Sequence, residues 1–264
     1  MNYRFICDET QLRVFYETFQ SKVCENVNVN DCSIKVMLQS RRKYNSQKQS
    51  QATVSVARRA FALHNDADAF VQWMKHFQVE RGLYVDRADK DGNAAAFSDE
   101  SMVLYVTSNA LSRAQAMKTT VMNAVRDYLG VDLSQLNNTL PFPALDKQFM
   151  TQLHKEPCTK VQRIDVDTQD KDLLNVLDTV LIEQQADVLF VIKTKNGYHY
   201  TLRNGPVMRQ LHQLCGEYGT DLLSLDKNGM NVIPGTLQAG TPVELIFAKG
   251  RAEYARLGSG KEMP

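Results

Sequence analysis

The sequence predicts an α+β protein in which an N-terminal α/β module precedes a second half built from strands and helices in a regular order. Three observations predict this class. Of the 264 residues, 43% are hydrophobic and 23% are charged, which suits a globular chain able to bury a sizeable core. Apolar residues recur at helical spacing in some segments and at strand spacing in others. Turn-forming residues such as Asn196 and Gly197 separate these segments.

The N-terminal half is expected to alternate helices with strands. Its first helix opens with Asp8 and Gln11 at capping-box spacing. Its third helix is marked by Ala114, Met117 and Val121, which recur at helical period. The expected elements are helices over residues 8–23, 67–79 and 111–128, strands over residues 33–38 and 102–106, and a polar, basic loop over residues 40–51.

The second half has a clearer order of strand, helix, strand, strand, helix, strand. The expected strands cover residues 161–166, 188–192, 198–202 and 221–225, and the expected helices cover residues 173–181 and 206–218. This is the order of a split βαβ unit, as in ferredoxin-like and RNA-recognition-like folds, where the first and third strands are central neighbours. A further hairpin is expected from residues 230–233 and 243–247.

One segment is the best candidate for a connection between two halves. Residues 130–146 combine two prolines with Asn and Ser, which favour turns and loops. We therefore expect an N-terminal module over residues 1–145 and a catalytic core over residues 146–264. The two are expected to pack as one composite unit.

Charge and cysteine content limit the classes of function. The chain has 31 Lys and Arg against 30 Asp and Glu, so any nucleic-acid binding must be local. Five cysteines without CxxC spacing disfavour a disulfide framework and a zinc ribbon, and they indicate a reducing compartment. No run approaches the roughly 20 apolar residues of a membrane span, and the start lacks the apolar stretch of a signal peptide. We expect a cytoplasmic protein without a membrane partner.

Two acids at the end of one expected strand are the first candidates for chemistry. Asp165 and Asp167 are two residues apart, so both carboxylates leave the same face of an extended chain. Such a pair can hold Mg²⁺ or Mn²⁺, which prefer oxygen ligands and can clamp the oxygens of a transferring phosphoryl group. The alternative is that these acids are solvated or cap the following helix, a role for which Asp167, Thr168 and Asp170 compete.

A histidine follows on the strand after the hairpin turn. Gly197 and His199 are separated by one residue, and the split βαβ order would bring His199 beside the two acids. There the imidazole could donate to a phosphate oxygen. Lys193 and Lys195 flank the turn and could add positive charge. A packed structural histidine and solvated lysines are the alternatives.

The third candidate is Asp226, which follows the last expected strand and precedes an Asn-Gly turn. An acid at this strand end could complete a metal site, with Asp221 and Glu244 as substitutes. Ordinary hairpin chemistry explains the same pattern equally well. The Pro-Gly-Thr stretch over residues 234–236 is expected near the same sheet edge, where it could shape a nucleotide pocket.

Together these motifs resemble those of the archaeo-eukaryotic primase superfamily, most closely its primase-polymerase branch in mobile elements and phages. The resemblance lies in the hydrophobic-Asp-hydrophobic-Asp run that ends at Asp167, the small-x-His motif from Gly197 to His199, and the hydrophobic-Asp motif at Asp226. It covers about 90 residues. It implies that Asp165, Asp167 and Asp226 bind the divalent metal, that His199 contacts the phosphates of the incoming nucleotide, and that the core is RNA-recognition-like.

A polymerase also needs a groove for nucleic acid. Two basic clusters, Arg41-Arg42-Lys43 and Arg58-Arg59, could contact phosphates, and Tyr44 could stack on a base. Basic loops that are only solvated are the alternative.

The sequence is therefore compatible with three functions. The first is a metal-dependent DNA primase or polymerase that acts on single-stranded or primed DNA with nucleoside triphosphates, beside a helicase or other replication protein. The second is a non-catalytic protein that binds nucleic acid or a replication partner. The third is a metal-dependent nuclease, because paired carboxylates and a histidine also suit hydrolysis.

Overall fold

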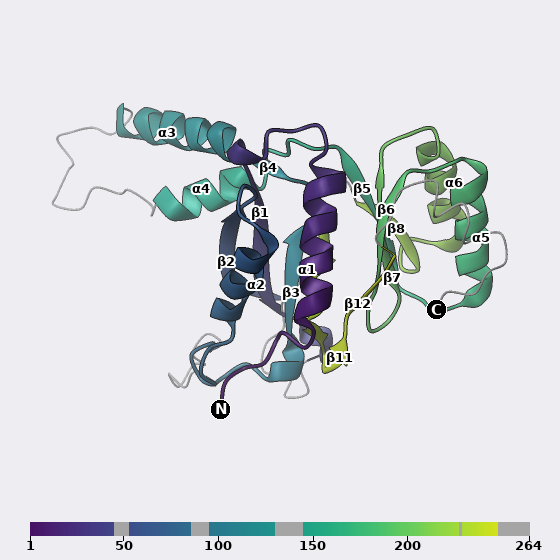
Figure 1. Cartoon of the computed structure of the whole chain (residues 1–264), viewed down its shortest axis with the longest axis horizontal. Helices are drawn as coiled ribbons and strands as arrows, with labels where there is room; N and C mark the ends of the chain where they lie inside the picture. Colours follow the sequence, from purple (N-terminus) through teal and green to yellow (C-terminus); the bar gives the residue numbers. More distant parts are fainter. Residues whose placement is uncertain (45–52, 86–94, 130–144, 227–228, 248–264) are drawn as a thin grey trace.

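Two five-stranded antiparallel β-sheets form the framework of the protein, and helices pack against both of them (Figure 1). The computed structural model describes residues 1–44, 53–85, 95–129, 145–226 and 229–247. Helices and strands are interspersed along the chain and the strands form antiparallel sheets, which confirms the expected α+β class. Within the described residues, no helix is both long and apolar enough to cross a membrane.

The N-terminal sheet has the strand order β2-β1-β3-β9, with β4 paired to one end of β1. Helices α1 and α2 pack on one face, because Ile34, Val36 and Leu38 alternate along β1 and are fully buried against them. Asp8 caps α1 by accepting from two backbone amides of its first turn. The elements are β1 Cys32–Ser40, β2 Val54–Ala62, β3 Met102–Thr107, β4 Leu111–Ser112, β9 Met230–Val232, α1 Glu9–Thr18, α2 Ala67–Met74, α3 Arg113–Leu129 and α4 Leu145–Leu153.

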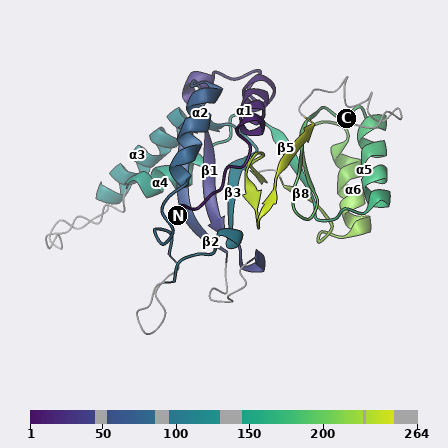
Figure 2. The ribbon, with the colours of Figure 1, turned by 60° about the horizontal axis from the view of Figure 1, so that its bottom comes forward.

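The C-terminal sheet has the order β12-β6-β7-β5-β8, and all its pairings are antiparallel. As expected from the sequence, β5 and β7 are neighbours. Helices α5 and α6 cover the face that points away from the N-terminal sheet (Figure 2), where they bury Ile164 and Val166 of β5. The elements of this part are β5 Val161–Val166, α5 Lys171–Glu183, β6 Val188–Lys193, β7 Tyr198–Arg203, α6 Met208–Tyr218, β8 Leu223–Asp226 and β12 Glu244–Phe247. Strands β10 Leu237–Gln238 and β11 Thr241–Pro242 pair with each other in a separate two-stranded sheet.

One apolar cluster spans both sheets, and a second lies between the C-terminal sheet and helices α5 and α6. Phe190 of β6 packs edge-on against Phe15 of α1, with 5.5 Å between the ring centroids. Strand β9 belongs to the C-terminal half of the sequence but pairs with β3 in the N-terminal sheet. The face of the C-terminal sheet opposite α5 and α6 therefore lies against the N-terminal part of the chain. Residues on that face lie between the two sheets.

The expected hairpin of residues 230–233 and 243–247 is wrong. Strand β9 pairs with β3, whereas β12 pairs with β6 at the far edge of the other sheet. Between them, Gly235 adopts a φ of 77° and its carbonyl accepts from the amides of Cys7 and Asp8. A Cβ at Gly235 would lie 2.2 Å from the Asp8 carbonyl, so the Pro-Gly-Thr stretch packs closely against the start of α1.

Several short elements and one helix face were not predicted. The sequence predicted none of β2, β4, α4, β10 and β11. Helix α3 begins after Ser112 and buries Ala116 and Thr120, whereas the expected markers of its period, Met117 and Val121, are exposed. Residues 45–51 of the expected basic loop and most of the expected connection, residues 130–144, lie outside the described residues.

Candidate active site between the sheets

Asp165 and His199 lie directly opposite each other on neighbouring strands. The register of β5 and β7 pairs them, so both side chains project from the same face of the sheet. His199 Nε2 lies 3.1 Å from Asp165 Oδ1. The expected proximity of this histidine to the first acid is therefore confirmed, and it follows from strand register.

The partner of the other ring nitrogen identifies the tautomer of His199. The backbone N–H of Val232 donates to Nδ1 at 3.4 Å, so the ring hydrogen is on Nε2 and points at Asp165. Burial lowers the pKa of His199, although the hydrogen bond to Asp165 and its charge oppose this. The imidazole is therefore neutral at physiological pH and acts as a fixed donor.

Asp165 is ionised at neutral pH. Burial raises the pKa of its carboxyl, but the hydrogen bond from His199 and the positive charges of Arg163 and Lys43 outweigh burial and bring this pKa to about 2. The side chain is 24% exposed. Asp165 is therefore a carboxylate that lies between the sheets and remains accessible.

Asp226 is linked to Asp165 by Arg163, which contacts both carboxylates. The register of β5 and β8 pairs Arg163 with Asp226. Arg163 Nη2 lies 3.0 Å from Asp165 Oδ2 and 3.5 Å from Asp226 Oδ2. Of the two substitutes, Glu244 lies on β12 at the opposite edge of the sheet, 3.6 Å from Lys193, and Asp221 lies in the turn before β8. Asp226 is thus the acid that shares a cation with Asp165.

Asp167 follows β5 and is exposed. Its backbone N–H donates to the carbonyl of Leu222, and its carboxylate acts electrostatically on both His199 and Tyr44. It does not cap the next helix, because Asp170 accepts from the first amides of α5. The capping alternative is therefore excluded for Asp165 and Asp167.

Two glycines permit close backbone contacts around the site. A Cβ at Gly197 would lie 1.8 Å from the carbonyl oxygen of Val166, so only glycine lets the β6–β7 turn approach the end of β5. A Cβ at Gly229 would lie 2.7 Å from Arg163 Nε and 2.9 Å from Asp226 Oδ2. The small residue two positions before His199 is therefore required by packing.

Basic and aromatic side chains border the acids. Arg41 Nη1 donates to the Tyr105 hydroxyl at 2.8 Å. Lys43 Nζ and Lys195 Nζ lie 5.3 and 5.5 Å from the centroid of the Tyr44 ring. We call these five residues the basic rim. Lys43 also lowers the pKa of Asp165, so the rim lies within electrostatic reach of the acids.

The other expected basic residues lie elsewhere. Lys193 is beside Glu244, Arg59 lies over the Phe77 ring at 5.1 Å, and Arg58 donates to Ser55 Oγ at 2.8 Å. Arg42 lies in a short 3₁₀ turn, and its side chain is outside the described part. The structure therefore brings Arg41, Lys43 and Lys195 toward the acids and does not bring Lys193 or Arg59 there.

Arg163 was missed by the sequence reading, although its position carried a signal. It lies two residues before Asp165, so the alternation of a strand puts both side chains on one face. Tyr105 carried no comparable signal, because it belongs to the other sheet.

The acids offer oxygen ligands suited to a hard divalent cation. Among the described residues, no group of three or more His, Cys, Asp or Glu side chains is arranged to hold a metal ion. Asp165 and Asp226 nevertheless converge on one guanidinium nitrogen, so both carboxylates already share a positive charge. A divalent cation bound by both carboxylates would have to take the place of that guanidinium.

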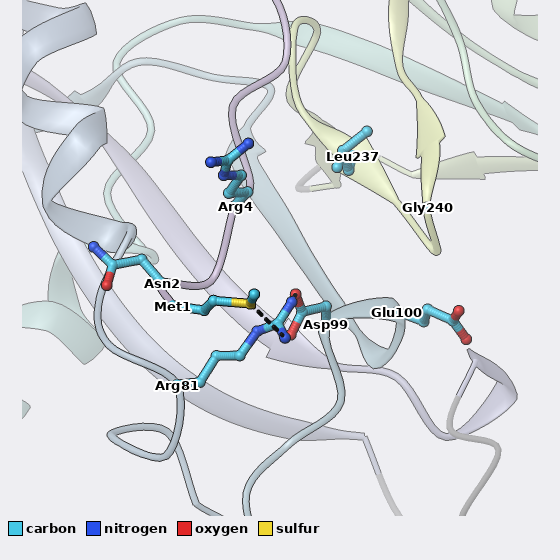
Figure 3. A pocket seen from close by; sticks show the side chains of 8 residues that line it. All are labelled: Met1, Asn2, Arg4, Arg81, Asp99, Glu100, Leu237 and Gly240. Atoms are coloured by element: carbon cyan, nitrogen blue, oxygen red, sulfur yellow. Dashed lines mark hydrogen bonds and ion pairs between the residues drawn. The ribbon is translucent and has the colours of Figure 1, made fainter.

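A pocket of about 450 Å³ lies apart from these residues (Figure 3). Its lining includes Arg4, Arg81 and Asp99, and Arg81 is already paired with Asp99 at 2.6 Å. None of the acids or rim residues lines it, so it does not belong to the candidate site.

No family model matches this chain, and searches of curated proteins and of solved structures find no match.

Proposed function

We propose that the protein is a metal-dependent nucleotidyltransferase that makes or extends primers on single-stranded or primed DNA. One observation carries this proposal: the Asp165–His199 pair shares Arg163 with Asp226 and lies within electrostatic reach of Lys43 in the basic rim. Acidic side chains that would hold a cation and basic side chains that would hold a triphosphate are thus next to each other.

The strand order supports an RNA-recognition-like catalytic core. Along the C-terminal sheet the strands of the split βαβ unit run β8-β5-β7-β6, which is fourth, first, third, second in sequence order. This order is what brings the three acidic and histidine motifs onto adjacent strands. Strand β12 extends the unit at the edge beside β6.

Each residue has a role in this proposal. Asp165, Asp167 and Asp226 would hold Mg²⁺ or Mn²⁺, which when bound neutralises phosphate charge and orients the reacting oxygens. His199, fixed as an Nε2 donor, would contact a phosphate oxygen. Lys195 and Arg41 would hold the triphosphate or template phosphates, and Tyr44 offers a face for a base.

The proposal is tested by incorporation of labelled nucleotide on single-stranded and primed DNA with Mg²⁺ or Mn²⁺. We expect wild-type protein to extend the primer and the Asp165→Ala, Asp167→Ala double variant to lose this activity while it still binds DNA. Absence of synthesis with every metal and template would refute the proposal. Template cleavage without nucleoside triphosphate would indicate the nuclease instead.

One observation favours a second candidate, a non-catalytic nucleic-acid-binding or replication-partner protein. Arg163 already neutralises two of the acids, so the site can be stable without a metal. In that case DNA binding would persist without turnover and would not respond to divalent cations.

A further inference from the structure

Arg163 is held at the centre of the acidic site. Its side chain is only 11% exposed. Nη2 contacts Asp165 and Asp226, and Nη1 donates to the carbonyl of Met230. Gly229 packs against Nε and leaves no space for a Cβ there. The guanidinium thus lies between two carboxylates, where a divalent cation shared by both would have to bind.

This location is incompletely satisfied. Nε of Arg163 is buried and has no hydrogen-bond partner among the described residues. A buried donor without a partner costs free energy, so a competing cation displaces this guanidinium more easily than a fully bonded one. The charges of Arg163 and of a divalent cation in the same site would also repel each other strongly.

We propose that Arg163 is a built-in counter-cation that neutralises Asp165 and Asp226 in the metal-free protein and must leave before a divalent cation can bind both. The inference rests on the proposed metal-dependent function and adds a mode of regulation to it. Metal binding and release of Arg163 are then one coupled event.

The test is a titration with Mn²⁺, in which free Mn²⁺ is measured by electron paramagnetic resonance. Arg163→Gln removes the charge and keeps most of the side-chain volume. Arg203→Gln is the matched control, because Arg203 lies on the neighbouring strand and pairs with Asp187 and Glu25 instead. We expect Arg163→Gln to bind Mn²⁺ at least about tenfold more tightly than wild type, because a nearby positive charge is gone. Arg203→Gln should match wild type.

Further variants locate the effect and guard against misfolding. Adding Asp226→Asn to Arg163→Gln should abolish the gain. If Arg163→Gln does not give a cooperative thermal transition, Arg163→Met replaces it, and a gain above wild type is again expected because the positive charge is gone. Equal or weaker Mn²⁺ binding by these variants, while wild type binds well, overturns the role of Arg163 alone. No Mn²⁺ binding by wild type or any variant overturns both this inference and the proposed function.

A second feature, the contact between two cysteines, is independent of the acidic site. Cys32 Sγ and Cys158 Sγ are 3.0 Å apart, although the residues are 126 positions apart in sequence. Cys32 begins β1 and is buried, and Cys158 is half-buried shortly before β5. The two thiols therefore join the N-terminal sheet to the segment that leads to Asp165.

The geometry points to a reversible disulfide between Cys32 and Cys158. A small-molecule disulfide such as oxidised glutathione would serve as oxidant. The two cysteine sulfurs form one S–S bond, and their two protons and two electrons pass to the oxidant, which becomes two thiols. The bond would tie β1 to the start of β5.

Oxidised glutathione is the probe, with peptide mapping and thermal unfolding as readouts. We expect a mapped Cys32–Cys158 link and a melting temperature raised by at least about 3 °C, because the closed loop is long. Cys32→Ser and Cys158→Ser should each abolish the link, and Cys215→Ser, in a separate apolar cluster, should not. A link from Cys24 to Cys32 instead, or no link under conditions that alkylate Cys158, would overturn this assignment.

Discussion

Replacing Gly197 with alanine tests whether the β6–β7 turn must touch the end of β5. The added Cβ would lie 1.8 Å from the carbonyl oxygen of Val166 and 2.9 Å from the amide nitrogen of Thr168. Both obstacles are backbone atoms, so no side chain can rotate to make room. The turn must move away, and the pairing of His199 with Asp165 must move with it.

Overpacking costs about 1–3 kcal/mol and occasionally more, and a backbone obstacle places Gly197→Ala at about 3 kcal/mol. For a chain of this size about 1 kcal/mol shifts the melting temperature by roughly 2–4 °C, so we expect a fall of roughly 6–12 °C. The assay is thermal unfolding followed by circular dichroism, with the free energy of unfolding from urea titration as a second measure.

Gly205→Ala is the matched control. A Cβ at Gly205 meets nothing within 4 Å, and Gly205 does not adopt the left-handed conformation. We expect this variant to stay within about 0.5 kcal/mol of wild type. If Gly197→Ala has the same melting temperature as Gly205→Ala and wild type, the packing argument for the small residue before His199 is refuted.

Three further predictions follow from the charges of the site. The pKa of Asp165 is lowered from 3.8 to about 2, so the stabilisation by its carboxylate is present above pH 4 and is lost as pH falls to about 2. Asp165→Asn should therefore lower the free energy of unfolding at pH 7 by about 2 kcal/mol, and the difference from wild type should shrink between pH 4 and pH 2. Burial lowers the pKa of His199 below 6.5, so folding favours the neutral ring and stability falls as pH drops below 6.5; His199→Gln should flatten this fall in urea titrations at several pH values, and an unchanged slope would contradict the assignment. Lys43→Ala and Lys195→Ala should each reduce the slope of log affinity for single-stranded DNA against log salt by about 1, as measured by fluorescence anisotropy, whereas Arg209→Ala, exposed on α6, should leave the slope unchanged.

Local pattern determined the elements of the candidate site and the faces on which its residues lie. Strand alternation put Asp165 on a defined face of β5, and the Asn-Gly turn set the strand that carries His199. The same alternation contained the position of Arg163, two residues earlier. These properties depend on neighbours in sequence, so they can be read without the fold.

The order of the elements predicted that β5 and β7 are neighbours, but only the tertiary structure decided the other contacts around the site. The sequence named Asp226 as the third acid with Asp221 and Glu244 as substitutes, and the pairing of β8 with β5 places Asp226 beside Arg163. Likewise β9 and β12 have the pattern of a hairpin, yet each pairs with an edge in a different sheet. Strand pairing between distant segments depends on which sheet edges remain unpaired once the sheets have formed. Competition between strands for these edges cannot be predicted from the local sequence.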